Sequence, residues 1–239
     1  MMFIFEELAH HKIVPVIAID DTAHALPLAE ALIAGGLPVA EITFRSPVAA
    51  EVIRLMTRAF PQMIIGAGTV LTIETLDAAQ ASGAAFGVAP GLNARVVAHA
   101  QARGLPFMPG VATPSDIEAG LELGCVCQKF FPAEALGGVN MLSALSAPYL
   151  HTGVRFMPTG GVTAANARDY LSLPAVLAVG GTWIAKKEDM AAGRWATITA
   201  NCIAARELLG TQMTQIKEIS ADDSQKNLRQ SRTSASSAC

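Results

Sequence analysis

Lys129 lies inside an otherwise uncharged and mostly apolar run, Cys125 to Ala133, that has the length and bulk of a buried strand. Burial disfavours the charged form of a lysine, which leaves a free lone pair on the amine. A neutral lysine amine is the nucleophile of Schiff-base chemistry. The other interpretation is a lysine at a strand end that reaches solvent or pairs with a carboxylate. This strand makes Lys129 a candidate nucleophile, and by itself it leaves both interpretations open.

A carboxylate and a guanidinium occur together in an earlier predicted strand. Val39, Glu41, Thr43 and Arg45 alternate along the chain, so the two-residue period of a strand places them on one face. One interpretation is an ion pair between Glu41 and Arg45 that closes the mouth of a barrel. In the functional interpretation Glu41 transfers protons and Arg45 binds a substrate carboxylate with two hydrogen bonds, a geometry that suits guanidinium better than ammonium.

Small residues and a hydroxyl mark the ends of the next two predicted strands. Gly66, Ala67 and Gly68 let a ligand approach the backbone, and Thr69 places a hydroxyl at the carboxyl end of the third strand. Pro90 ends the fourth strand. A proline there is ordinary punctuation between strand and loop, and it can also shape the floor of a pocket.

Paired glycines follow the last two predicted strands. The pair Gly160 and Gly161 comes one residue after the seventh strand, and Gly180 and Gly181 directly follow the eighth, just before Thr182. Such turns expose backbone N–H groups beside helix starts, where barrels of parallel strands often bind phosphate. The turns fit neither a P-loop nor a dinucleotide fingerprint. We therefore expect a site for a phosphate group carried by a small molecule.

The elements that must position these residues alternate between β-rich runs and alanine-rich runs of helical spacing, with a period of about 20 to 25 residues. Several helices are expected to begin at capping residues such as Thr72, Asn93 and Thr113. The strands are expected at Lys12–Ile19, Val39–Arg45, Met63–Val70, Ala85–Pro90, Pro106–Val111, Cys125–Phe131, Val154–Pro158 and Val176–Val179. The helices are expected at Ala23–Ala34, Val48–Ala59, Ile73–Ala81, Ala94–Ala102, Ser115–Leu123, Val139–Ser146, Ala164–Leu171 and Met190–Leu208.

Eight such βα units favour an α/β protein with one closed (β/α)8 TIM barrel over a doubly wound open sheet. Function is then expected at the carboxyl ends of the strands. We place the barrel domain at residues 1–210. Residues 211–239 are polar and rich in serine, so they bury too little apolar surface to offset ordering, and we expect a disordered tail.

The composition limits the kinds of partner, compartment and cofactor that we expect. Hydrophobic residues make up 51% of the chain and charged residues 15%, but no uninterrupted apolar run is long enough to cross a bilayer. The amino terminus carries no export signal, which makes the cytoplasm the expected compartment. A net charge of -3 with scattered basic residues lacks the footprint of a nucleic-acid binder. No metal or other cofactor is expected, because the histidines do not converge at strand ends. They are His10, His11, His24, His99 and His151.

Together these segments closely resemble the 2-keto-3-deoxy-6-phosphogluconate (KDPG) aldolase family, from about residue 11 to about residue 208. The segments are Glu41 to Arg45, Gly66 to Val70, Ala89 to Leu92, Lys129 to Glu134, Pro158 to Gly161 and Gly180 to Trp183. The resemblance implies a metal-independent class I aldolase on a (β/α)8 barrel. It also implies a homotrimer that cleaves KDPG to pyruvate and glyceraldehyde 3-phosphate.

The resemblance also implies the roles around pyruvate. Lys129 would be the Schiff-base residue and Glu41 the general acid and base. Arg45 and Thr69 would hold the pyruvate carboxylate.

The remaining roles concern the pocket walls and the aldehyde portion. By the same resemblance, Pro90 and Phe131 would line the pyruvyl pocket, and Thr159 would contact the aldehyde portion. The phosphate would lie at Gly160, Gly161 and Thr182. Relatives often have serine at the last position, and threonine keeps its hydroxyl while adding a methyl group.

Three alternatives keep the barrel and change the function. An aldolase of the same chemistry could prefer 4-hydroxy-2-oxoglutarate or 2-keto-3-deoxy-6-phosphogalactonate, and only relative kcat/KM values separate these substrates. A phosphosugar isomerase or epimerase would use the glycine turns without an imine. A non-catalytic sensor of a phosphorylated ligand would bind without forming pyruvate, and it would have no obvious use for Lys129, Glu41 and Arg45 together.

Overall fold

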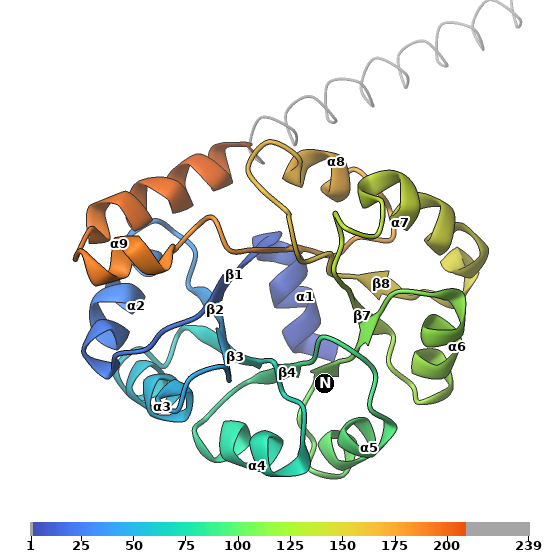
Figure 1. Cartoon of the computed structure of the whole chain (residues 1–239), viewed down its shortest axis with the longest axis horizontal. Coiled ribbons are helices and arrows are strands. Elements are labelled where there is room, and N and C mark those ends of the chain that lie inside the picture. The colour runs from blue at the N-terminus through green and yellow to red at the C-terminus, as the bar shows by residue number, and fades with distance from the viewer. Residues whose placement is uncertain (1, 209–239) are drawn as a thin grey trace, which may run out of the picture.

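Parallel strands form a ring that is surrounded by helices (Figure 1). The structure is a computed structural model and describes residues 2–208. The predicted tail of residues 211–239 lies outside the described residues. None of the helices within residues 2–208 is both long and apolar enough to cross a membrane.

The strands pair in parallel along two sheets, in the orders β5-β4-β3-β2-β1-β9 and β6-β7-β8. They are β1 (Ile13–Ile17), β2 (Val39–Thr43), β3 (Ile64–Gly68), β4 (Phe86–Val88), β5 (Phe107–Met108), β6 (Gly110–Val111), β7 (Cys127–Phe130), β8 (Arg155–Phe156) and β9 (Val179–Gly181). Only Pro109 separates β5 from β6, so both belong to the single fifth strand that the sequence predicts. Proline has no N–H for the ladder, which accounts for the break.

The two sheets also meet on the other side of the ring. Parallel bridges join Phe156 to Val176 and Thr159 to Gly180. The predicted eighth strand, Val176–Val179, is therefore shifted: its first part pairs with β8, and β9 pairs with β1. The chain through Pro109 joins the two sheets on one side and these bridges join them on the other, so the ring of strands closes. The predicted (β/α)8 architecture is confirmed.

Helices follow the strands and form the outer layer (Figure 1). They are α1 (Met2–His11), η1 (Thr22–His24), α2 (Ala25–Ala34), α3 (Ala49–Ala59), α4 (Ile73–Ala81), α5 (Ala94–Ala102), α6 (Pro114–Glu122), α7 (Gly138–Ser146), η2 (Ala147–Thr152), α8 (Ala167–Leu171) and α9 (Lys187–Ala191). The predicted last helix is interrupted, because residues 195–208 form a separate helix after α9. The predicted caps are confirmed, since the side chains of Thr72, Asn93 and Thr113 accept hydrogen bonds from the first turns of α4, α5 and α6.

Helix α1 precedes the first strand, and the sequence analysis did not predict it. In Figure 1 it lies over the centre of the ring. Phe5 and Leu8 are buried in one cluster with Val14 and Val39 from the strands. The amino-terminal helix therefore covers the end of the barrel opposite the carboxyl ends of the strands.

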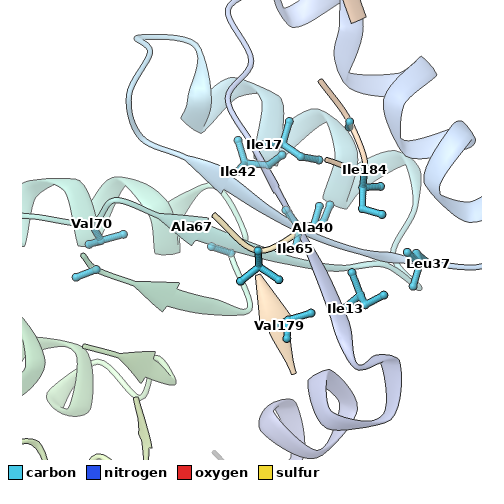
Figure 2. Close-up of a cluster of buried hydrophobic side chains, with 14 of the residues drawn as sticks. Ile13, Ile17, Leu37, Ala40, Ile42, Ile65, Ala67, Val70, Val179 and Ile184 are labelled. Carbon is cyan, nitrogen blue, oxygen red and sulfur yellow. The ribbon is translucent and has the colours of Figure 1, made fainter. Parts of the chain in front are cut away.

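The strand side chains divide into two sets. Figure 2 shows part of the larger core cluster, and one set packs there, including Ala40 and Ile42 of β2. The alternate residues of β2 are Val39, which joins the smaller apolar cluster, Glu41 and Thr43. Residues of both sets are buried along the whole of β2. The barrel interior is thus apolar near α1 and carries charged groups toward the carboxyl ends.

Candidate active site

Lys129 and Glu41 meet inside the barrel. Lys129 comes from β7 and Glu41 from β2, which lie far apart in the ring. The Nζ of Lys129 donates a hydrogen bond of 3.1 Å to Oε1 of Glu41. The lysine side chain is 6% exposed and the glutamate side chain 0%. The structure therefore brings these two predicted site residues together, and Lys129 is buried and paired with a carboxylate rather than reaching solvent.

The space for the Glu41 carboxylate comes from the neighbouring strand β3. Thr43 pairs with Gly68 in the β2–β3 ladder. A Cβ added at Gly68 would lie 2.2 Å from Oε1 of Glu41. Glycine is therefore required beside the carboxylate, which explains Gly68 in physical terms.

The second oxygen of Glu41 is available for chemistry. Its Oε2 is buried and has no hydrogen-bond partner within the described residues. A buried carboxylate oxygen without a partner is costly in a protein interior. An oxygen in that state, next to a lysine amine, is suited to accept a proton from a substrate or from a bound water.

Arg45 lies at the rim rather than on the strand. The last ladder bond of this stretch runs from Phe44 N to the Gly68 carbonyl, and Arg45 N then donates back to the Thr43 carbonyl. The predicted strand Val39–Arg45 is therefore two residues too long, because the chain turns after Thr43. Arg45 is exposed, and its Nε donates a hydrogen bond of 3.3 Å to the Thr43 hydroxyl.

Thr43 thus has a place in the site that the sequence analysis did not assign. Its hydroxyl is 3.1 Å from the Ile17 carbonyl, to which it donates, and the residue is 2% exposed. A buried hydroxyl that donates to one strand and accepts from Arg45 fixes the position of the Nε atom of the guanidinium group. The alternation of Glu41, Thr43 and Arg45 was the available sequence signal.

Thr69 and Pro90 flank the same end of the barrel. Thr69 directly follows β3 with a φ of 58°, a left-handed conformation that is uncommon for a threonine and often marks functional sites. Pro90 lies against β6, since a Cβ added at Gly110 would lie 2.1 Å from the carbonyl atoms of Pro90. Gly110 pairs with Lys129 in the ladder. Pro90 is therefore separated from Lys129 by one strand.

Phe131 lies beside the amine. The Nζ of Lys129 lies over its ring, 5.6 Å from the ring centre. Phe131 directly follows β7, and the next peptide bond, to Pro132, is cis. An aromatic ring beside a buried amine provides an apolar wall for whatever carbonyl compound reaches that amine.

The turn of Gly160 and Gly161 presents free backbone donors. Their φ values are 96° and 81°. Within residues 2–208 neither N–H group donates a hydrogen bond. Successive N–H groups in such conformations form a concave site for anions. Thr159, directly before the turn, is 3% exposed and pairs with Gly180, two residues before the exposed Thr182.

The predicted site residues therefore fall into two groups. Lys129, Glu41 and Phe131 are joined by direct contacts. The others surround them at the strand ends, and within the described residues neither Arg45 nor Thr182 contacts Lys129 through a hydrogen bond. Within the described part of the chain, the arrangement combines a buried amine, a carboxylate and a glycine turn with undonated N–H groups at one end of the barrel.

Comparisons with known proteins point to one family. Residues 4–201 match the family model of KDPG and KHG aldolases. The 2-dehydro-3-deoxy-phosphogluconate aldolase of Treponema pallidum is 48% identical over 84% of this chain and 94% of its own length. The KHG/KDPG aldolase of Escherichia coli K12 is 42% identical over 78% of this chain and 87% of its own length.

A solved structure gives the same result at the level of the fold. The KDPG aldolase of Legionella pneumophila, crystallised with pyruvate captured as a covalent carbinolamine intermediate, is 42% identical and superposes with a TM-score of 0.80. The match covers 84% of this chain and 96% of that chain. A family match over most of the chain, joined to the buried lysine and glutamate pair, establishes that this protein belongs to the KDPG and KHG aldolase family.

Proposed function

We propose that this protein is a class I aldolase that cleaves KDPG to pyruvate and glyceraldehyde 3-phosphate, with Lys129 as the imine-forming nucleophile. The observation that carries the proposal is the buried hydrogen bond of 3.1 Å between Nζ of Lys129 and Oε1 of Glu41. The pair supplies both requirements of the reaction, an amine and a base that can exchange protons with it.

The first half of the reaction forms the imine. The Lys129 ammonium gives a proton to Glu41 across their hydrogen bond, and the free amine attacks the C2 ketone of the substrate. Glu41 then returns that proton to the carbinolamine hydroxyl, which leaves as water. The product is a protonated imine, and Glu41 is again a carboxylate.

The second half breaks the carbon–carbon bond. Glu41, directly or through a water, accepts the proton of the C4 hydroxyl, and the electrons of the C3–C4 bond move into the imine. Glyceraldehyde 3-phosphate leaves, and the enamine of pyruvate remains on Lys129. Glu41 then protonates C3, and hydrolysis releases pyruvate and the amine.

The surrounding residues bind the two ends of the substrate in this proposal. Arg45 and Thr69 hold the carboxylate next to the C2 ketone, and Phe131 and Pro90 form apolar walls around it. Thr159 contacts the aldehyde portion. The phosphate is bound by the N–H groups of the glycine turn and by a hydroxyl, from Gly160, Gly161 and Thr182.

Borohydride trapping tests the proposal. With pyruvate, borohydride should add a stable mass to the wild-type protein but not to Lys129→Ala, which should also lose all turnover in a coupled lactate dehydrogenase assay. Lys187→Ala is the matched control, because Lys187 pairs with Asp20 at the surface. The Lys187→Ala protein should still be labelled at Lys129. A labelled Lys129→Ala would remove Lys129 from the mechanism, and an unlabelled wild type would favour an isomerase or a sensor.

A second substrate has a specific observation in its favour. The Escherichia coli relative carries both KHG and KDPG in its name. The proposed chemistry at Lys129 and Glu41 does not require a phosphate, so 4-hydroxy-2-oxoglutarate is also a candidate substrate. The ratio of kcat/KM values for the two substrates measures the preference.

We further propose a homotrimer that acts in the cytoplasm. The trimer follows from the family resemblance of the sequence. Light scattering after gel filtration should give about three times the chain mass of 24.9 kDa, and a monomer mass would contradict the trimer.

A further inference from the structure

The last residue of the lysine motif has no part in the proposed chemistry but makes a short contact. Glu134 lies between β7 and α7, and its Oε1 accepts a hydrogen bond of 2.5 Å from the hydroxyl of Tyr170. Tyr170 is on α8 and is 0% exposed. Burial and the hydrogen bond to Glu134 raise the pKa of Tyr170, so its hydroxyl remains a donor at neutral pH.

Glu134 also touches the glycine turn, in two independent ways. Its backbone N–H donates 3.0 Å to the carbonyl of Gly160. Its side-chain methylene groups lie against Gly161, because a Cβ added there would be 2.6 Å from both Cβ and Cγ of Glu134. One residue therefore contacts both members of the turn.

The turn receives a further contact from α8. The Gly161 carbonyl accepts a hydrogen bond of 3.3 Å from Asn166, the residue just before α8. Tyr170 lies on α8 itself and donates a hydrogen bond to Glu134, the other residue that contacts the turn. In Figure 1, α7 and α8 are neighbours on the ring, and the turn is contacted by Glu134 and Asn166 from the segments that precede these two helices.

Such support matters because glycines have many accessible backbone conformations. Two successive glycines with positive φ lose more conformational entropy than other residues when they are held in one shape. Their unpaired N–H groups bind an anion well only if both already point at it. External contacts that hold the turn therefore raise its affinity for a phosphate.

We propose that the hydrogen bond from Tyr170 to Glu134 positions the Gly160–Gly161 turn and thereby sets the preference for phosphorylated substrates. Tyr170 and Glu134 are positioning residues, because neither needs to touch the substrate. The proposal rests on the proposed function insofar as the glycine turn holds the KDPG phosphate. It separates phosphate binding from imine formation, which depends on Lys129 and Glu41.

The test removes the hydrogen bond and compares ligands with and without phosphate. Tyr170→Phe should raise the KM for KDPG about tenfold, the loss expected when a hydrogen bond to a charged acceptor is removed. The pyruvate concentration that gives half-maximal borohydride trapping should stay at the wild-type value. Inorganic phosphate, titrated by calorimetry, should bind more weakly to Tyr170→Phe, and this readout needs no turnover.

Two glutamate variants test the acceptor without disturbing a buried side chain. Glu134→Ala should reproduce the effect of Tyr170→Phe, and the double variant should be no worse than either. Glu134→Gln keeps an acceptor oxygen and the methylene groups, so its KM for KDPG should return toward the wild-type value. These variants also decide the matter if Tyr170→Phe folds poorly.

The second tyrosine of the chain is the matched control. Tyr149 donates to Glu118 at 2.8 Å, but this pair is exposed on η2 and α6. Tyr149→Phe should leave the KM for KDPG and phosphate binding unchanged. Equal losses for KDPG and pyruvate in Tyr170→Phe, or no loss for either, would overturn the positioning role. Failure of the wild-type protein to cleave KDPG would instead contradict the proposed function, and phosphate calorimetry would still decide the role of Tyr170.

Discussion

The amine of Lys129 and the carboxylate of Glu41 are 3.1 Å apart although 88 residues separate them in the chain. They come from opposite regions of the ring, and both are buried. Each would be costly in the interior without the other, since a buried charge needs a partner. The same pair therefore stabilises the barrel interior and supplies the two groups that the proposed reaction uses.

Replacing Glu41 should separate catalysis from pyruvate binding. Glu41→Gln keeps the shape but removes the base, so kcat should fall about 100- to 10,000-fold, the usual contribution of general acid–base catalysis. Exchange of the pyruvate methyl protons, followed by NMR in deuterated water, should slow as well. The affinity for pyruvate, measured by titration calorimetry, should fall far less than kcat, whereas borohydride trapping should slow because Glu41 takes part in imine formation.

The control for this prediction is Glu118→Gln. It also neutralises one carboxylate, but at an exposed position on α6, and it should leave kcat unchanged. An unchanged kcat in Glu41→Gln would remove Glu41 from the mechanism.

Gly68→Ala should damage the site through Glu41. The new Cβ would lie 2.2 Å from Oε1 of Glu41 and 2.8 Å from its Cδ, so the carboxylate must move. A displacement of about 1 Å in a catalytic group can lower the rate roughly 100-fold, and overpacking should cost about 1 to 3 kcal/mol of unfolding free energy. Kinetics and chemical denaturation measure the two effects.

Gly91→Ala is the matched control for Gly68→Ala. A Cβ added at Gly91 meets no atom within 4 Å. The substitution should therefore leave kcat and stability close to the wild-type values. Full activity in Gly68→Ala would show that Glu41 can work from another position.

Thr43 should affect the binding of the substrate carboxylate through Arg45. Thr43→Val keeps the volume but removes the hydroxyl that accepts from Nε of Arg45. We expect KM for KDPG and half-saturation by pyruvate to rise about fivefold, corresponding to about 1 kcal/mol for one hydrogen bond, with kcat less affected. Thr43→Ser keeps the hydroxyl and should restore the wild-type values. A Thr43→Ser variant as weak as Thr43→Val would contradict the role of the hydroxyl.

The parts of the fold that the sequence predicted are those governed by local patterns. Alternation along the chain located β2, a mostly apolar run located β7, and the caps at Thr72 and Asn93 follow from their own side chains. Helix α1 was missed because its apolar residues acquire a function only when Phe5 and Leu8 cover the barrel end. The end of β2 was misplaced because the turn after Thr43 depends on where Gly68 of β3 stops pairing.

The candidate site likewise contains residues that local sequence predicts and contacts that only the folded chain defines. Residue type alone pointed to Lys129, since a charge in an apolar strand needs a reason. The contact of Glu134 with Tyr170 joins residues on separate βα units, and no spacing in the sequence indicates it. The need for glycine at position 68 depends on the register of β2 against β3, which only the folded sheet defines.

The amino-terminal cap of α6 gives a stability that depends on pH. Burial raises the pKa of Asp116, but hydrogen bonds from Ala112 N, the Thr113 side chain and Thr113 N outweigh it and hold the pKa below its ordinary value of 3.8. A carboxyl whose pKa is lowered by folding stabilises the protein above its unfolded pKa, and this contribution disappears as the pH falls through the folded pKa. Asp116→Asn should therefore be less stable than wild type near neutral pH, by about 1 kcal/mol for a weakened cap.

Thermal unfolding from neutral pH down to about pH 3 measures this effect. The Tm of Asp116→Asn should lie about 2 to 4 °C below wild type near neutral pH, as a loss of 1 kcal/mol implies for a domain of this size. The difference should shrink as the solution is acidified, because the wild-type carboxyl becomes protonated. Glu122→Gln, at an exposed position on the last turn of the same helix, should show no such pH-dependent difference. A difference for Asp116→Asn that stays constant down to acid pH would mean that the charge of Asp116 does not contribute to the cap.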